Sequence, residues 1–308
     1  MRVVRLYDGV EVPVIGQGTW GFGADPARRA QEVRTLQAGL DAGLSLIDTA
    51  QYYAAGGSER VVGAAIAANR AGAFVVTKVW PRMTTAAAVR DSVHASLRRL
   101  GSDYVDAVLM HWPSHGLPAE VWAPPLLALQ ASGAVRYLGV SNFSTRWLEE
   151  ALGALGPERM LAFHQLPYHL ADRRLERSLL AHNAQRRIVT MAYSPLGHRG
   201  PARLPGRDVV AEVARRRQVS AAQVLLNWVV RSGNVVAIPK ASSPAHAQDN
   251  AAAGDWVLSP DEVARLDAAC PPSRGEFTPL VPPYAGVFRL AFWLERRAHG
   301  RQADGDRP

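Results

Sequence analysis

Short apolar runs recur along the chain, and each has the length of a buried β-strand. Longer segments between them carry helix-forming residues, and this alternation is typical of α/β proteins. The candidate strands are residues 14–16, 44–47, 74–77, 104–110, 135–140, 161–164, 188–192 and 235–238. Eight strands alternating with helices predict either a doubly wound parallel sheet or a closed parallel barrel.

Several of the intervening helices have recognisable starts, in the form of a capping side chain or a proline in the first turn. These starts are Asp25-Pro26, Ser58 before Glu59, Thr85, Asp172 before Arg173, and Ser243-Pro244. The polar residues that end successive runs, from Asp48 to Tyr193, lie 23 to 33 residues apart. Each interval suits one strand, one loop and one helix.

This regular spacing favours a (β/α)8 TIM barrel among the α/β folds. No Gly-x-Gly-x-x-Gly follows the first strand, as a Rossmann domain would need. The interval from Tyr193 to Lys240 is longer, at 47 residues, and therefore holds an extra helix, either 208–217 or 221–230.

The two ends of the chain add to the barrel. Residues 3–6 and 10–13 flank Asp8-Gly9 and predict an N-terminal β-hairpin. Ser259 followed by Glu262 predicts a capped extra helix that runs to about Ala269. We therefore expect one barrel domain over 1–270 and an extension over 271–308, partly packed and partly disordered.

Within that extension, residues 287–294 are nearly all apolar. Three interpretations remain open for this segment: packing on the barrel beside the substrate mouth, a weak membrane-surface anchor, or a dimer contact. We favour packing on the barrel.

Composition narrows the class of protein. The chain has 308 residues, of which 48% are apolar and 20% charged, as in ordinary globular proteins. No apolar run reaches the ~20 residues that cross a bilayer, and Asp8 and Glu11 interrupt the N-terminus before any signal-like core, so we expect a cytoplasmic protein. The single cysteine, Cys270, excludes an internal disulfide and a cysteine-built metal site.

The basic residues argue against nucleic acid as a partner, despite a formal charge of +8, because they are scattered and form no binding motif. Of 35 basic residues only Lys78 and Lys240 are lysines. We expect both to need a compact ammonium that titrates, which a guanidinium cannot replace.

A polar residue ends each apolar run from the second to the eighth. These residues are Asp48, Lys78, His111, Ser141-Asn142, Gln165, Tyr193-Ser194 and Lys240. In a parallel barrel all strand C-termini share one rim, so these side chains would converge on one active-site face.

The convergent set favours addition to a carbonyl. A tyrosine beside an ammonium can donate a proton, and we expect the ammonium to lower the tyrosine pKa towards neutral pH. A carboxylate would hold the lysine, and a neutral imidazole would donate to a substrate oxygen. The sequence shows no metal-ligand spacing and no Gly-x-Ser-x-Gly, so hydride would have to come from a nicotinamide or flavin.

The motifs at the strand ends resemble those of the aldo-keto reductase family from about residue 16 to 269. They are Asp48-Thr49-Ala50-x-x-Tyr53, Gly57-Ser58-Glu59, Thr77-Lys78-Val79-Trp80, Leu109-Met110-His111-Trp112-Pro113, Gly139-Val140-Ser141-Asn142-Phe143, Tyr193-Ser194-Pro195-Leu196-Gly197, and Ile238-Pro239-Lys240 followed by Asn250. The resemblance implies a barrel that binds NADP(H) across its rim. It also implies that Tyr53 is the general acid, tuned by Lys78 and Asp48, and that His111 orients the carbonyl.

The resemblance further implies the contacts of the cofactor. The nicotinamide end would meet Thr19, Ser141, Asn142, Gln165 and Tyr193, the diphosphate would meet Ser194, Leu196 and Gly197, and the adenosine end would meet Lys240, Ser242, Ser243, His246, Asp249 and Asn250. The family often has arginine where this chain has His246. The resemblance implies NADP(H) as the preferred cofactor, and the histidine leaves NAD(H) possible. Trp20, Trp80 and Trp112 would wall the substrate pocket.

Among relatives, the pattern looks most like bacterial reductases of small aldehydes and dicarbonyls such as methylglyoxal. Our leading hypothesis is an NADPH-dependent carbonyl reductase acting as a monomer or weak homodimer. One alternative is a cofactor-binding, redox-sensing subunit with little turnover. The other is a Schiff-base aldolase that uses Lys78 or Lys240.

Overall fold

The computed structural model describes residues 1–81, 85–197, 200–201, 204–272 and 275–279. Within these residues eight parallel strands form one sheet, in which each strand pairs with its neighbour in the sequence. The strands are β3 (Gln17–Gly18), β4 (Leu46–Asp48), β5 (Phe74–Val79), β6 (Val105–Met110), β7 (Val135–Ser141), β8 (Phe163–Pro167), β9 (Val189–Tyr193) and β10 (Val235–Ala237).

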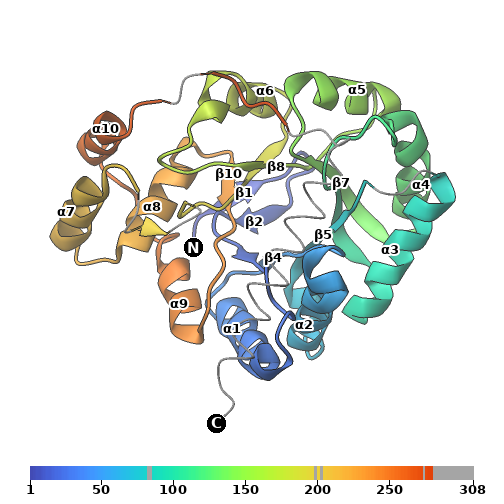
Figure 1. Cartoon of the computed structure of the whole chain (residues 1–308), viewed down its shortest axis with the longest axis horizontal. Coiled ribbons are helices and arrows are strands. Elements are labelled where there is room, and N and C mark those ends of the chain that lie inside the picture. The colour runs from blue at the N-terminus through green and yellow to red at the C-terminus, as the bar shows by residue number, and fades with distance from the viewer. Residues whose placement is uncertain (82–84, 198–199, 202–203, 273–274, 280–308) are drawn as a thin grey trace, which may run out of the picture.

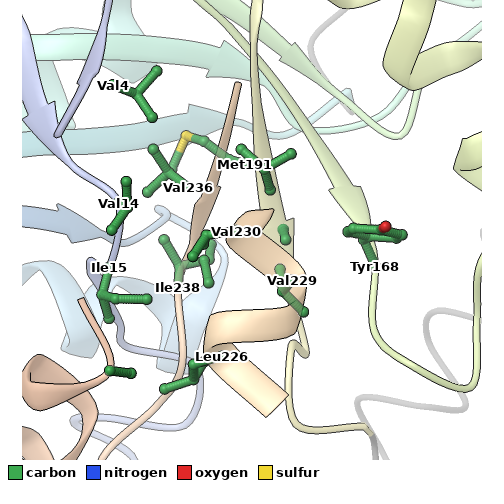
Figure 2. Packing of buried hydrophobic residues seen from close by; sticks show 14 of the residues in the cluster. Val4, Val14, Ile15, Tyr168, Met191, Leu226, Val229, Val230, Val236 and Ile238 are labelled. Atoms are coloured by element: carbon green, nitrogen blue, oxygen red, sulfur yellow. The ribbon is translucent and has the colours of Figure 1, made fainter. Parts of the chain in front are cut away.

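Backbone hydrogen bonds join the first strand segment to the last and close the sheet. The Ala237 amide donates to the Val14 carbonyl at 2.9 Å, and the Gly16 amide donates back to the Ala237 carbonyl at 2.8 Å. Figure 2 shows Val14 and Ile15 beside Val236 and Ile238, where apolar side chains cover this seam. The predicted TIM barrel is confirmed.

The first strand differs from its prediction. Residues 14–16 were expected to form it, but the regular ladder with β4 begins at Gln17. Residues 14–16 instead bond towards β10, with one isolated bridge from Ile15 to Ala237. A Cβ on Gly18 would lie 2.6 Å from the Ile238 carbonyl oxygen, so glycine at this position lets the seam close.

Helices surround the strands (Figure 1). They are α1 (Arg29–Asp41), α2 (Gly57–Ile66), α3 (Ala86–Leu100), α4 (Ala119–Ala131), α5 (Thr145–Leu155), α6 (Leu179–Gln185), α7 (Arg207–Arg217), α8 (Ala221–Val229), α9 (Pro244–Ala252) and α10 (Pro260–Ala269). Both candidates for the extra helix are therefore helical. Helix α8 packs on β10, whereas α7 packs outside it against α8 and α10, so α7 is the addition.

The helix caps follow the predictions in part. Thr85 and Ser243 cap α3 and α9, and Ser259 forms a capping box with Glu262 at the start of α10. Ser58 is not a cap, because it lies inside α2 and its hydroxyl bonds elsewhere. Asp172 accepts hydrogen bonds from the Arg174 amide and side chain at the start of a short 3-10 helix, Arg174–Arg177, and the α-helix α6 begins later, at Leu179.

The N-terminal hairpin and the described part of the extension pack on the barrel. Strands β1 (Val3–Arg5) and β2 (Glu11–Pro13) form the predicted hairpin, and Val4 and Val12 are buried in the core. In the extension, Phe277 is buried beside the Arg174 guanidinium. The segment 287–294 and its three interpretations lie outside the described residues. Among the described residues, no helix is long and apolar enough to cross a membrane.

Asp106 joins three segments at the N-terminal end of the barrel. Its buried carboxylate accepts hydrogen bonds from the Val75 amide, the Arg70 guanidinium and the Arg136 guanidinium, each at 2.8 Å. It therefore ties β5, β6 and β7 together on the side opposite the strand C-termini.

We predict that Asp106→Ala lowers the free energy of unfolding by about 3–5 kcal/mol, because it leaves two arginines and one buried amide without their acceptor. Urea unfolding followed by circular dichroism measures this. Asp103→Ala, at an exposed position nearby, is the control and should change the free energy by less than about 0.5 kcal/mol. A loss below about 1 kcal/mol for Asp106→Ala would contradict the prediction.

Candidate active site

Lys78 lies at the centre of the residues that the sequence placed at the strand ends. Its side chain is 1% exposed, and its ammonium nitrogen lies 2.8 Å from Asp48 Oδ2, 2.8 Å from the Tyr53 hydroxyl and 2.9 Å from the Thr49 carbonyl oxygen. All three protons of the ammonium therefore have an acceptor. His111 completes the group, with its ring edge-on to the Tyr53 ring at a centroid distance of 5.7 Å.

Strand register brings these residues together. Asp48 is the last residue of β4, Lys78 the fifth residue of β5, and His111 follows the end of β6. Since the strands are parallel neighbours, their C-termini share one rim and their inward side chains meet. Gln165, the third of the five residues of β8, also reaches this point and donates to Asp48 Oδ1 at 2.7 Å.

A strained turn follows Tyr53. Ala54 and Ala55 both have positive φ angles, 48° and 51°, and Gly56 follows at 85°. Two consecutive alanines in the left-handed region cost of order 1 kcal/mol each and persist only where packing holds them. Here Gly57 fits against Gly23, where a Cβ would lie 2.6 Å from the Gly23 carbonyl oxygen. After this turn α2 begins at Gly57, four residues beyond Tyr53, and the Tyr53 hydroxyl contacts Lys78.

The pKa of Tyr53 moves in the direction opposite to our prediction. Burial, followed by the negative charge of Asp48, raises this pKa well above its ordinary value. The prediction counted only the ammonium and omitted both effects, which sequence does not quantify. Tyr53 is therefore a protonated phenol at neutral pH, which is the state that a proton donor requires.

Burial also sets the charge state of His111. Burial and the nearby Lys78 cation lower the pKa of His111 well below its ordinary value, so the imidazole is neutral. Its Nδ1 is buried and has no hydrogen-bond partner among the described residues. Trp80 packs edge-on to the ring at 5.1 Å and fixes its orientation.

A second polar group lies beside His111. Asn142 has a positive φ of 63°. Its side-chain nitrogen Nδ2 donates to the His111 carbonyl at 3.1 Å and to Ser141 Oγ at 3.0 Å. The Tyr193 hydroxyl donates to Asn142 Oδ1 at 2.9 Å. Ser141, Asn142, Gln165 and Tyr193 are thus held close to the Lys78 group, as their positions at strand ends predict.

The three tryptophans have different environments. Trp20 is 47% exposed and packs edge-on to the Tyr53 ring at 4.8 Å. Trp80 is buried and stacks on Tyr52 at 4.2 Å. Trp112 is half-buried directly after His111. Trp20 and Trp80 therefore flank the proton donor and the imidazole with apolar surface.

A second group of polar side chains lies at the N-terminus of α9, after β10. The Ser243 hydroxyl caps the helix, and the Ser242 hydroxyl lies 2.9 Å from His246 Nδ1. Gln31 of α1 donates to the Ser242 carbonyl at 3.0 Å. The Lys240 ammonium lies 5.5 Å from the Phe22 ring centroid, and burial and Arg28 lower its pKa.

Other predicted cofactor residues are placed differently. The Thr19 hydroxyl is fully buried, donates to the Asp48 carbonyl at 2.8 Å and meets Ser58. Both oxygens of the Asp249 carboxylate accept hydrogen bonds from α8 and its cap, through Gln223 and Ser220. Asn250 is buried and lines a small cavity between α1, α9 and β3. Ser194, Leu196 and Gly197 lie in the turn after β9, with φ angles of 51° and 77° at Ser194 and Gly197.

Sequence reasoning missed two contributions. The Thr49 carbonyl accepts a hydrogen bond from the Lys78 ammonium. In the sequence, only the position of Thr49 directly after Asp48 could have indicated this contact. The positive charge of Arg28 helps to lower the pKa of Lys240. In the sequence, only the position of Arg28 at the start of the first helix could have indicated this effect. Among the described residues no group of three or more His, Cys, Asp or Glu side chains could hold a metal ion.

Comparison with known proteins identifies the family and the fold. The sequence model of the Aldo/keto reductase family matches residues 14–270, which include the whole barrel. The chain belongs to this family. The aldo/keto reductases differ in their substrates, so family membership fixes the scaffold and the reaction class but not the carbonyl compound.

Relatives within the family are similar over nearly their whole length. The chain is 42% identical over 277 residues to methylglyoxal reductase YeaE of Escherichia coli (strain K12), covering 89% of this chain and 97% of that protein. It is 37% identical over 290 residues to an aldo-keto reductase of Mycolicibacterium vanbaalenii, covering 92% and 96%. A solved aldo/keto reductase of Klebsiella pneumoniae in complex with NADP and acetate has 41% identity and a TM-score of 0.85, covering 91% and 99%.

Proposed function

We propose that this protein reduces the carbonyl group of small aldehydes and ketones to alcohols with NADP(H). The observation that carries the proposal is the buried Lys78 ammonium bonded to both Asp48 and the Tyr53 hydroxyl. This arrangement places a protonated phenol beside a neutral imidazole. Membership of the aldo/keto reductase family supports the same reaction class.

The residues divide the chemistry between them. NADPH, when bound, would supply a hydride to the carbonyl carbon. Tyr53 donates its hydroxyl proton to the carbonyl oxygen, and Lys78 stabilises the phenolate that remains. His111 donates from Nε2 to the same oxygen and orients it, since its neutral state leaves one N–H available. Asp48 fixes the lysine and balances its charge.

The polar groups along the rim fit NADP(H). Asn142 and Gln165 offer amide groups, and Tyr193 a ring face, next to the catalytic group, where a carboxamide ring could be held. The first amides of α9 together with Lys240, Ser242 and Ser243 offer donors for a phosphate. Arg28 adds a cation there, which compensates in part for histidine at position 246. Ser194, Leu196 and Gly197 lie between these two groups in the turn after β9.

The substrate is proposed to be a small aldehyde or dicarbonyl such as methylglyoxal. Trp20 and Trp80 flank Tyr53 and His111 with rigid apolar surface, which suits a compact substrate. The relative from Escherichia coli is named a methylglyoxal reductase. The Schiff-base alternative is less well supported at Lys78. An aldolase needs a neutral free amine, whereas all three N–H groups of this ammonium donate hydrogen bonds.

We predict that Tyr53→Phe lowers kcat for methylglyoxal reduction by at least about 100-fold, because it removes the hydroxyl that carries the transferable proton and keeps the ring. NADPH binding, followed by quenching of tryptophan fluorescence, should stay within about twofold of wild type, which is below 0.5 kcal/mol. Tyr104→Phe, at the opposite end of the barrel, is the control for loss of a phenol. Unchanged turnover by Tyr53→Phe would rule out this mechanism.

We further predict that Lys240→Ala raises the Kd for NADPH by about tenfold and leaves the Kd for NADH within about twofold, because only NADPH carries the 2′-phosphate. Arg34→Ala removes an exposed cation from α1 and should change neither Kd. If Lys240→Ala weakened both cofactors equally, the phosphate would not lie at α9.

A further inference from the structure

Glu59 is a buried carboxylate that the proposed reaction does not use. It lies on α2 and its side chain is fully buried. The Thr77 hydroxyl donates to Oε1 at 2.6 Å, and Arg99 of α3 donates from Nε to Oε2 at 2.5 Å. Both carboxylate oxygens are therefore hydrogen-bonded, and the group is held as an anion inside the protein.

Thr77 connects this carboxylate to the catalytic lysine. Thr77 and Lys78 are consecutive residues of β5, and consecutive strand residues point to opposite faces of a sheet. Lys78 points into the barrel towards Asp48, so Thr77 points outward to α2 and Glu59. Glu59 thus contacts the outer side of the strand at the residue next to Lys78.

The charges around Lys78 are unevenly distributed. On the barrel side it meets Asp48, the Tyr53 phenol and the neutral His111. Outside the strand lies Glu59, hydrogen-bonded to Thr77, with Arg99 paired to Glu59 and the Arg99 and Arg60 side chains both close to Gly56. Burial lowers the pKa of Lys78, and the negative charges of Asp48 and then Glu59 oppose that effect.

We propose that Glu59 is a second carboxylate of the active site, which keeps the Lys78 ammonium charged and in place from outside the barrel wall. It is a positioning residue, because it acts on Lys78 through its charge and touches no reacting atom. This inference extends the proposed reductase function and rests on it, because Lys78 has a catalytic role only in that function. Its alternative is a purely structural role, in which the Glu59–Arg99 pair only joins α2, α3 and β5.

The composition of the chain allows a direct test. Lys78 and Lys240 are its only lysines, so protein labelled with 13C at lysine Cε gives two side-chain signals by NMR. Lys240→Arg assigns them. The chemical shift of the Lys78 signal followed against pH then reports the titration of that amine without any need for turnover.

We predict that Glu59→Gln lowers the pH at which Lys78 titrates by at least about half a unit, because a neutral amide keeps the shape but removes the charge. Thr77→Val removes the hydrogen bond and keeps the charge, so it should leave the titration of Lys78 unchanged. Since the proposed reaction needs protonated Lys78, kcat/KM is lost as pH rises through this titration. That loss should come at lower pH in Glu59→Gln and at the wild-type pH in Thr77→Val.

Glu59→Gln leaves Arg99 without its acceptor and can prevent folding, in which case the double variant Glu59→Gln/Arg99→Met replaces it. Arg99 is partly exposed and stands behind Glu59, so Lys78 should still titrate below its wild-type pH in the double variant. Titration of Lys78 at the wild-type pH in the folded variant overturns the inference and leaves only the structural role. If the wild type reduces no carbonyl, the proposed function fails, whereas a shifted Lys78 titration would still support the link to Glu59.

Discussion

The ammonium of Lys78, buried and fully hydrogen-bonded, is the interaction on which the rest of the site depends. A buried charge without partners costs several kcal/mol, so the chain must present an acceptor for each proton. Asp48, the Thr49 carbonyl and the Tyr53 hydroxyl do so from one short segment. That requirement fixes where the segment after β4 runs, and it leaves the phenol in contact with both the Lys78 ammonium and the His111 ring.

Other features of the fold serve this placement. The turn through Ala54 and Ala55 is strained, and close packing of Gly57 on Gly23 holds it. Thr19, Thr49 and Ser58 form a buried cluster of hydroxyls beneath Asp48. These contacts lie away from any substrate, yet they determine the position of the proton donor, which is why a site of this kind is built on rigid strand ends.

The alternation of apolar runs predicted a parallel α/β fold, because a parallel strand buried on both faces leaves a clear apolar signal. The regular spacing of the strand ends then favoured the barrel over a doubly wound sheet. The polar residues at the strand ends likewise predicted Asp48, Lys78 and His111 as neighbours. What the sequence did not reveal depends on three-dimensional contacts. The direction of the Tyr53 pKa follows from burial, and the pairing of Asp249 with Ser220 and Gln223 follows from the packing of α8 on α9.

Chemical rescue of Lys78→Ala tests the role of the ammonium most directly. The variant should lose at least about 100-fold in kcat and regain turnover, in a saturable way, when a primary alkylammonium such as ethylammonium is added. Tetramethylammonium, which has no N–H to donate to Asp48 and Tyr53, should not restore it. Wild-type turnover by Lys78→Ala, or equal rescue by both cations, would contradict the account.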